Sequence, residues 1–531
     1  MRRSFIGLAI IAVAAFVASC STDQTITGPE FGPTPSSLSL TKIGAFSGGG
    51  SAAAEITAYD PASKRLFIVN GALGSVDVVS LSNPATPTLI STISVAQFGA
   101  GANSVAVHNG LVGIAIQATN KTDPGKVAFY RATDLQLLSS VTVGALPDMI
   151  TFTPSGRYAL VANEAEPSDN YVTDPEGSIS IIDVANTAAP SVRTAGFASF
   201  NGQTAQLRTA GVRIYGPNAT VAQDLEPEFI TVSDDSRTAY VTLQENNALA
   251  VVDINAAAVT SVTPFGYKNH SVAGNGMDVS DRDGPTGGAM VNIRNWPVFG
   301  MYQPDGIASY TVAGQTYLVT ANEGDAREWG TFVEESRVSA LTLNPAVFTD
   351  AACGGGPCNA NARLGRLTVT KELGRNAVTG QYDALYALGG RSISIWTAAG
   401  QQVWDSGDQF EQRTTALTNV NFNASNSGNT LDDRSDNKGP EPEGVALARF
   451  GSKTFAFICL ERVGGIMVYD ITLPTSPSFV TYVSSRVGSG GDLGPEGIIV
   501  ISAANSPTGV PLLVVGNEVS GTTAIFQIVL Q

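Results

Sequence analysis

Histidine is almost absent from this chain. Only His108 and His270 occur among its 531 residues, and they stand far apart. Zinc sites with histidine ligands and Ser-His-Asp catalytic sets both need an imidazole beside other functional groups, so two isolated histidines argue against either kind of centre. The sequence also has no GxSxG segment ahead of a helix, and its glycine-rich stretches do not open helices. The abundant glycine therefore belongs to turns rather than to a nucleophile elbow or a nucleotide-binding loop.

Cysteine is scarce as well, with four residues in the chain. Cys353 and Cys358 bracket the segment Gly-Gly-Gly-Pro, and we expect a local disulfide between them in an oxidising compartment. A metal-binding pair is the alternative, but there is no second such pair and no histidine nearby. Cys459 lies in the apolar run 455–460, where a cysteine is usually an unreactive core residue.

Positive charge is in deficit. The chain has 30 Lys and Arg against 46 Asp and Glu, a formal net charge of −16, and its isoelectric point is about 4.6. Such a field repels nucleic acid and attracts cations, so we expect no nucleic-acid partner. The other interpretation is that the acidic surface simply keeps an exported protein soluble.

The N-terminus reads as a targeting segment. Arg2 and Arg3 precede an apolar stretch, residues 6–17, that is too short to span a bilayer permanently. The tetrapeptide Val-Ala-Ser-Cys that ends at Cys20 resembles a bacterial lipobox, which implies a lipid on Cys20 as the only contact with the membrane. An ordinary signal peptide is the alternative. Residues 1–20 would then be the signal peptide and 21–37, rich in Thr, Pro, Ser and Gly, a flexible tether.

The body of the chain repeats one unit. An acidic residue opens a short strand, a turn follows, and a second strand ends in Asn-Glu or a variant; a third strand comes next. Clear copies occupy residues 54–81, 103–130, 147–184, 226–254, 303–325, 441–471 and 494–529, and a partial copy occupies 383–408. Period-two alternation with turn residues between the runs is typical of antiparallel strands. The sequence therefore predicts an all-β fold, a β-propeller with seven or eight blades.

We expect one propeller domain over residues 38–531. The last unit lacks its outer strand, and the N-terminal run 38–46 could pair there and close the ring. Three long segments between units, near 185–225, 255–302 and 340–380, are expected to project from the rim as loops.

Several segments resemble a known family of exported bacterial propellers, the choice-of-anchor I domain family, which is similar to YVTN and LVIVD repeat propellers. They are LEPEFITVS, QPDGIASY, TANEGDARE, RSISIW, DNKGPEPEGV and GPEGI, within a resemblance that covers the chain after about residue 40. The resemblance implies a propeller outside the cytoplasm, in the cell envelope, and no settled activity. With the lipobox, it places the protein on the outer membrane or surface of a bacterium.

The repeat carries acidic residues at two fixed points. In a propeller the first strand of each unit lines the central channel, so the residues that open it meet at one mouth. Those residues are Glu55, Asn103, Asp148, Glu228, Asp305, Glu443 and Glu496. The glutamates that close the second strand, after the chain has reversed direction, should return to that mouth: Glu164, Glu245, Glu323, Glu461 and Glu518.

A crowd of carboxylates needs a compensating cation. Oxygen-only ligands suit a hard ion, so the sequence predicts a divalent cation, Ca²⁺ first, held by Asp148, Glu164, Glu228, Glu245, Asp305, Glu323, Glu443, Glu461, Glu496 and Glu518. The alternative is that these groups cap turns and accept backbone N–H bonds.

Basic residues near the same mouth allow a second hypothesis. They are Arg327, Arg391, Arg434, Lys438 and Arg462, which could hold phosphoryl oxygens beside a metal. The chain would then be a metal-dependent phosphoesterase for a phosphorylated small molecule. The other hypothesis is a module that binds a protein or glycan, with the basic residues paired to neighbouring acids. A phosphoesterase needs three or more carboxylates and two or more cations to converge on one concave site.

Overall fold

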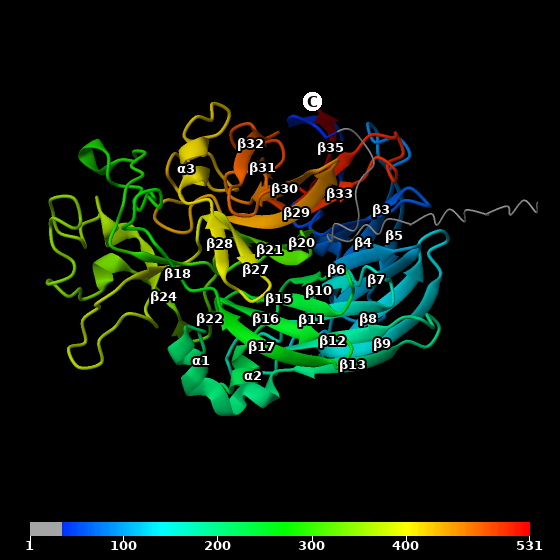
Figure 1. The fold of residues 1–531 in the computed structure, drawn as a ribbon, viewed down its shortest axis with the longest axis horizontal. Coiled ribbons are helices and arrows are strands. Elements are labelled where there is room, and N and C mark those ends of the chain that lie inside the picture. The colour runs from blue at the N-terminus through cyan, green and yellow to red at the C-terminus, as the bar shows by residue number, and fades with distance from the viewer. Residues whose placement is uncertain (1–33) are drawn as a thin grey trace, which may run out of the picture.

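Seven four-stranded antiparallel sheets make up most of the protein. The computed structural model describes residues 34–531, and within them the sheets follow one another in chain order (Figure 1). The predicted signal peptide, the lipobox cysteine Cys20 and most of the tether lie outside the described residues. Among the described helices, none has the length and apolar character needed to cross a bilayer.

Each sheet runs from an inner strand to an outer one. The first three sheets consist of β2 (Thr57–Asp60), β3 (Arg65–Asn70), β4 (Ser75–Ser80) and β5 (Thr88–Ser94); β6 (Gly101–His108), β7 (Leu111–Gln117), β8 (Pro124–Arg131) and β9 (Leu137–Ala145); and β10 (Pro147–Phe152), β11 (Tyr158–Asn163), β12 (Ser178–Asp183) and β13 (Ser191–Gly196).

The fourth and fifth sheets consist of β14 (Ile230–Val232), β15 (Thr238–Leu243), β16 (Ala248–Asp253) and β17 (Ala258–Pro264); and β20 (Ile307–Val312), β21 (Gln315–Asn322), β27 (Ser392–Thr397) and β28 (Gln402–Asp405). The sixth and seventh consist of β29 (Pro442–Phe450), β30 (Lys453–Leu460), β31 (Ile466–Asp470) and β32 (Ser478–Val483); and β33 (Pro495–Ile501), β34 (Leu512–Asn517), β35 (Thr522–Leu530) and β1 (Leu38–Ser47).

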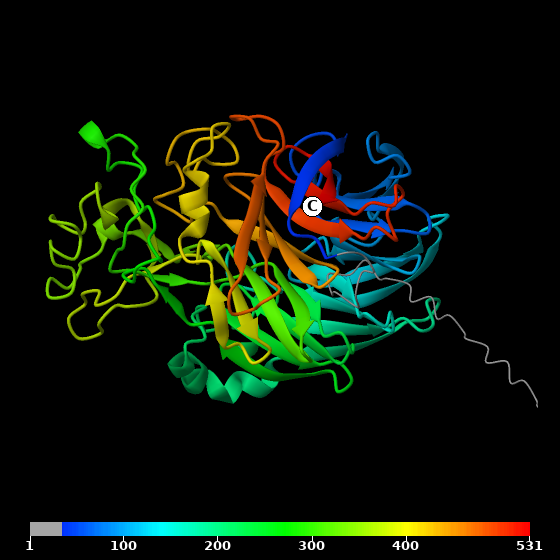
Figure 2. The same cartoon turned by 45° about the horizontal axis from the view of Figure 1, so that its top comes forward.

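The N-terminal strand completes the C-terminal sheet. β1 pairs antiparallel with β35, from Leu38 opposite Leu530 to Ser47 opposite Thr522 (Figure 2). The last sheet therefore combines the first and last strands of the described chain, as the short final unit predicts. This pairing gives the otherwise unpaired edge of β35 a hydrogen-bonding partner.

The partial unit at 383–408 is not an eighth blade. Its two runs form β27 and β28, the outer half of the fifth sheet, in which β27 pairs with β21. The chain leaves this sheet after β21 and returns some 70 residues later, at Ser392. An intervening insertion split one unit into two sequence segments, and the second segment lacked an inner strand for that reason.

Hydrophobic clusters fill the space between neighbouring sheets. Tyr59 and Leu66 of the first sheet pack with Leu512 and Val514 of the seventh, and the inner strands β2 and β33 contact each other. Similar clusters join the other neighbouring sheets. The alternating apolar residues of each strand thus face an adjacent sheet on both sides, and their burial is the main stabilising contribution of the fold.

The long inter-unit segments are more ordered than loops. β13 and β17, within the expected 185–225 and 255–302 segments, are outer strands. Each has a single buried residue, so both lack the alternation of buried apolar residues that marks a strand. Residues 198–224 then form η2 (Ala198–Gln203), α1 (Thr204–Ala210) and α2 (Val221–Asp224). The remaining helical turns are η1 (Gly71–Leu73), η3 (Pro285–Gly287), η4 (Val338–Ala340), η5 (Leu364–Arg366) and α3 (Gln409–Thr414).

An inserted lobe stands beside the propeller (Figure 1, left). It contains a five-stranded sheet of β18 (Tyr267–Asn269), β19 (Phe299–Met301), β26 (Tyr386–Ala387), β25 (Thr368–Thr370) and β24 (Glu335–Arg337). A separate hairpin is formed by β22 (Glu328–Trp329) and β23 (Phe332–Val333). The lobe has its own hydrophobic core, which includes Cys353 and Cys358, bonded to each other as a disulfide. Cys459 is buried in β30.

Candidate functional site

Six carboxylates lie where the inner strands begin. Asp148, Glu443 and Glu496 are the second residues of β10, β29 and β33; Glu55, Glu228 and Asp305 come two residues before β2, β14 and β20. The inner strands contact one another in succession. Their starting ends therefore surround one mouth of the channel, as the repeat predicts. The second sheet has Asn103 in this place, and its side chain donates to the Pro147 carbonyl at 3.2 Å.

The second strands end at the same mouth. The backbone N–H of Glu164 donates to the Leu146 carbonyl, just ahead of β10, at 2.9 Å, and that of Glu461 donates to the Glu441 carbonyl at 2.8 Å. Glu518 makes the equivalent bond to Gly494 at 2.7 Å. Glu245 and Glu323 directly follow the Gln244 and Asn322 positions of their units. Both repeated acidic positions therefore meet at one end of the propeller.

The asparagine and the glutamate of each Asn-Glu pair have different structural roles. Asn163 is fully buried and donates to the carbonyl and hydroxyl of Ser178 and to the hydroxyl of Ser180. Asn322 likewise donates to the hydroxyls of Ser392 and Ser394 on the neighbouring strand. These amides hold the second and third strands together. The glutamates that follow them are left to face the mouth.

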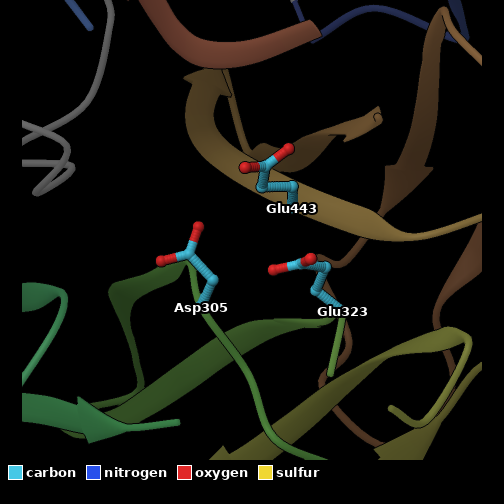
Figure 3. A group of neighbouring side chains, drawn as sticks. All are labelled: Asp305, Glu323 and Glu443. Atoms are coloured by element: carbon cyan, nitrogen blue, oxygen red, sulfur yellow. The ribbon is translucent and has the colours of Figure 1, made fainter. Parts of the chain in front are cut away.

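Three of the carboxylates converge into a compact group, which we call the open triad: Asp305, Glu323 and Glu443. One oxygen from each lies within 4.8 Å of the others, and Figure 3 shows the three side chains pointing toward one another. Glu323 has two polar neighbours, since Gln244 Nε2 donates to its Oε2 at 2.9 Å and Lys438 Nζ to its Oε1 at 2.8 Å. Oε2 of Glu443 is buried without a hydrogen-bond partner among the described residues, and so is Oε2 of Glu228.

Burial and mutual repulsion raise the pKa values of the mouth carboxylates. Desolvation is the main cause, and the nearby charges that add to it are other acids of the mouth. The pKa of Glu55 and that of Asp148 rise to about 7. The pKa values of Glu164, Glu228, Asp305, Glu443 and Glu496 are raised well above the ordinary range. A cation at the mouth would favour the ionised forms that burial disfavours.

A second group of acids is already neutralised from within. In this group, the paired cluster, Glu441 is fully buried and contacts Lys438 Nζ at 3.0 Å, Arg462 Nε at 3.1 Å and Arg434 Nη2 at 2.6 Å. Arg462 Nε also lies 3.1 Å from Glu461 Oε2. Burial alone would raise the pKa of Glu441, but these three cations outweigh it and lower that pKa to about 2. An oxygen of Glu441 and one of Glu461 lie within 4.8 Å of Glu323, so the paired cluster adjoins the open triad.

The five basic residues proposed as phosphate ligands all have protein partners. Arg434, Lys438 and Arg462 belong to the paired cluster. Arg327 is 2% exposed and binds Asp224 at 2.6 Å and Glu226 at 2.7 Å. Arg391 is also buried and binds Glu411 at 2.6 Å and the backbone carbonyls of Asp278, Ser435 and Asn437. Carboxylates and cations do converge at the mouth, but the cations are bound to acids.

The sequence analysis missed Asp224, which binds Arg327 beside Glu226, and Glu411, which binds Arg391. Asp224 ends α2 in the segment between the third and fourth sheets, and Glu411 lies in α3, after β28. Neither residue belongs to a repeated unit, so the pattern that found the mouth could not find them. An ion pair between residues far apart in the chain leaves no recognisable pattern in a single sequence.

Comparison with known proteins assigns the family. A model of the choice-of-anchor I domain matches residues 55–474. The chain belongs to this family. The match begins at Glu55, the first acid of the mouth, and ends before the seventh sheet, so it is shorter than the span after residue 40 that the sequence resemblance indicated.

Two curated relatives match parts of this choice-of-anchor I protein. Gigasin-3a of Magallana gigas is 32% identical over 187 residues, 32% of this chain and 66% of the relative. A mesenchyme-specific cell surface glycoprotein of Strongylocentrotus purpuratus is 27% identical over 290 residues, 48% of this chain and 36% of the relative. The chain thus spans just under two thirds of one relative and about a third of the other.

Solved structures resemble the chain only at the level of fold. Kuenenia stuttgartiensis hydrazine synthase matches with a TM-score of 0.48 and 14% identity, covering 91% of this chain and 97% of the other. A streptogramin B lyase matches with a TM-score of 0.44 and 9% identity, covering 93% and 98%. Similarity this distant says nothing about activity.

Proposed function

We propose that this choice-of-anchor I protein is a binding module and that its ligand surface is the acidic mouth of the propeller. The family and the fold support a binding role. The observation that carries the proposal is the open triad, in which Asp305, Glu323 and Glu443 bring three carboxylate oxygens within 4.8 Å of one another. Groups so close repel one another strongly unless a cation lies between them.

The proposed occupant of the open triad is a divalent cation, with Ca²⁺ preferred. The donors are all oxygens, which suits Ca²⁺ and Mg²⁺ and not the softer metals. They come from three separate segments, the starts of β20 and β29 and the end of β21. Ca²⁺ tolerates irregular sets of six to eight oxygens, whereas Mg²⁺ demands a near-ideal octahedron. Oε2 of Glu443, buried without a partner, is a donor that such an ion would satisfy.

A location in the cell envelope completes the proposal. The lipobox at Cys20 would supply a lipid anchor, and the tether would hold the propeller away from the membrane. One relative is named a cell surface glycoprotein, which is consistent with a place outside the cytoplasm. Partners at the mouth would then be proteins or glycans of the envelope. The phosphoesterase hypothesis has no specific support, because its candidate cations are engaged by Glu441, Glu461, Asp224, Glu226 and Glu411.

Calorimetric titration of the metal-free protein with Ca²⁺ tests this proposal. We expect a saturable isotherm with one dominant site, and loss of that site in Glu443→Gln. The matched control is Asp234→Asn, an exposed acid at the β14–β15 turn, at the opposite end of its sheet from the mouth. An absence of binding heat up to millimolar Ca²⁺, in both wild type and control, would overturn the cation site. Turnover of phosphate mono- or diesters that depends on Ca²⁺ would instead revive the phosphoesterase hypothesis.

A further inference from the structure

The central channel contains a cavity beside the open triad, and Asp305 of the triad is one of its lining residues. Its volume is about 130 Å³, and inner strands of several sheets form its wall. Much of the wall is apolar, including Ile56, Val105, Ile150 and Val445. The cavity has room for several water molecules or a short aliphatic chain. Its lining thus combines an apolar wall with the acidic residues of the mouth.

Two carboxylates outside the open triad also line this cavity. Asp148 and Glu496 open the inner strands of the third and seventh sheets. Among residues 34–531 these two acids are not part of a compact group like the open triad, with its oxygens within 4.8 Å. They belong to different sheets and line the same cavity, so a ligand there could use both as acceptors. An ammonium group makes longer contacts, of about 2.8 Å, and can reach acceptors that are further apart.

A third acceptor lies in the cavity without a partner. Thr57 lines the cavity, is 4% exposed, and its Oγ1 makes no hydrogen bond to any described residue. A buried hydroxyl without a partner is unfavourable, so its presence here indicates a hydrogen-bonding partner, from solvent or from a ligand, that the protein itself does not supply. Thr57 follows Glu55 by two residues, and Gly497, next to Glu496, packs against the Glu55 carbonyl. The unpartnered hydroxyl is therefore on the side of the channel where Glu496 stands.

We propose that the channel binds a primary alkylammonium group, whose N–H donors contact Asp148, Glu496 and Thr57 Oγ1 and whose aliphatic chain lies along Val105 and Ile150. The three donors of such a group match two carboxylates and one hydroxyl, all acceptors. The apolar wall removes the aliphatic chain of the ligand from water, and this burial stabilises the bound state. A metal ion has no apolar surface to bury there. This inference rests on the proposed function, because it names a ligand class for the same mouth.

A chain-length series tests it without any change to the protein. Methyl-, ethyl-, propyl- and butylammonium ions would be titrated into the full protein at neutral pH with saturating Ca²⁺. Each added methylene buries more apolar surface, so affinity should rise about three- to fourfold per step. n-Butanol, which has the chain but no charge, should not bind measurably. Equal affinity for methyl- and butylammonium would overturn the inference, because it would mean that charge alone attracts them.

Two variants separate this inference from the cation site. Asp148→Asn should weaken butylammonium binding at least tenfold and keep a Ca²⁺ isotherm, while Asp234→Asn should change neither. Glu443→Gln should lose Ca²⁺ binding and keep the dependence on chain length. If Ca²⁺ binds but the amines show no such dependence, the inference fails and the proposed function stands. If neither ligand binds, the mouth is not a binding site and both fail.

Discussion

The open triad and the paired cluster are neighbours built from the same kind of residue, yet their charges are balanced in opposite ways. Glu441 is surrounded by Lys438, Arg434 and Arg462. Asp305 and Glu443 face other carboxylates instead, and only Glu323 has a cation, Lys438, beside it. The chain itself supplies the cations of the cluster, whereas the proposed function assigns the triad a cation from outside. Perturbed acids of this kind are candidates for a functional site, while buried ion pairs also occur as purely structural features.

Breaking the paired cluster should have the largest effect on stability. Glu441→Gln leaves Lys438, Arg434 and Arg462 without their buried counter-charge, and we expect the free energy of unfolding to fall by about 3–5 kcal/mol. Urea unfolding measures this. The control is Asp134→Asn, which removes one partner of an exposed pair with Arg131 and should leave the transition midpoint unchanged. Equal, small effects for both variants would mean that the cluster does not hold the fold together.

Removing a carboxylate from the open triad should have the opposite effect on stability. Without Ca²⁺, Glu443→Gln replaces a buried carboxyl group whose ionised form is disfavoured by burial and by the neighbouring acids, so the protein should unfold at the same or a higher temperature than wild type. With Ca²⁺ at about a hundred times its dissociation constant, wild type should gain about 2.7 kcal/mol and the variant nothing. Thermal melts with and without chelator decide this. A variant that is strongly destabilised without Ca²⁺ would contradict the idea that the triad is uncompensated.

The acids of the mouth should make the stability of the protein depend on pH. Glu55 and Asp148 have pKa values of about 7 in the folded protein, above the 4.5 and 3.8 of unperturbed side chains. Acids with a raised folded pKa stabilise the fold below the unfolded pKa, and this contribution is lost as pH rises through the folded pKa. In chelator, the free energy of unfolding should therefore fall between pH 5 and pH 8, by roughly 1–3 kcal/mol.

Ca²⁺ should oppose this loss, because it favours the ionised carboxylates. The difference in melting temperature between Ca²⁺ and chelator should thus grow from pH 5 to pH 8. Glu441 has a pKa lowered to about 2, so this residue should add no pH dependence in this range. Glu461 beside it should add to the loss, because burial and the neighbouring acids raise its pKa to about 8. A stability profile in chelator that is flat from pH 5 to pH 8 would show that the mouth acids are compensated by some other group.

The smallest effect is expected at Thr57. Thr57→Val replaces a hydroxyl that has no partner, so the free energy of unfolding should change by no more than about 0.5 kcal/mol. Thr242→Val is the matched comparison, since Thr242 is fully buried and its Oγ1 lies 3.0 Å from the Asp305 carbonyl and 3.2 Å from that of Phe229. Its loss should cost about 1–3 kcal/mol. A large loss in Thr57→Val would show that its hydroxyl has a partner in the protein.

The repeated unit made the fold and the place of the mouth predictable. Strand alternation recurs in every sheet, and an acid stands at a fixed point of each repeat except the second, which has Asn103, so closing the repeats into a ring brings those acids together. β13 and β17 could not be recognised because both are outer strands in which few side chains are buried. The blade count stayed open because an insertion separates β21 from β27.

Within the mouth, sequence could not tell acids that are compensated from acids that are not. Glu441 directly precedes β29, and Glu443 is the second residue of that strand. Glu441 is held by three cations, whereas burial raises the pKa of Glu443 and the charges that act on it, which belong to other acids, raise it further. That difference depends on the direction of the two side chains. Where a strand begins irregularly, two residues that are two positions apart can face different neighbours. β29 pairs irregularly with β30 between Pro442 and Val445, at this very point.

A crystal structure of the protein grown with Ca²⁺ tests the central claim most directly. Anomalous scattering should place one ion between Asp305, Glu323 and Glu443, with carboxylate oxygens at about 2.3–2.6 Å. Lys438 should remain bound to Glu441, because that pair needs no outside charge. An anomalous map with no peak in the open triad at saturating Ca²⁺, or with the peak at the paired cluster instead, would contradict the account.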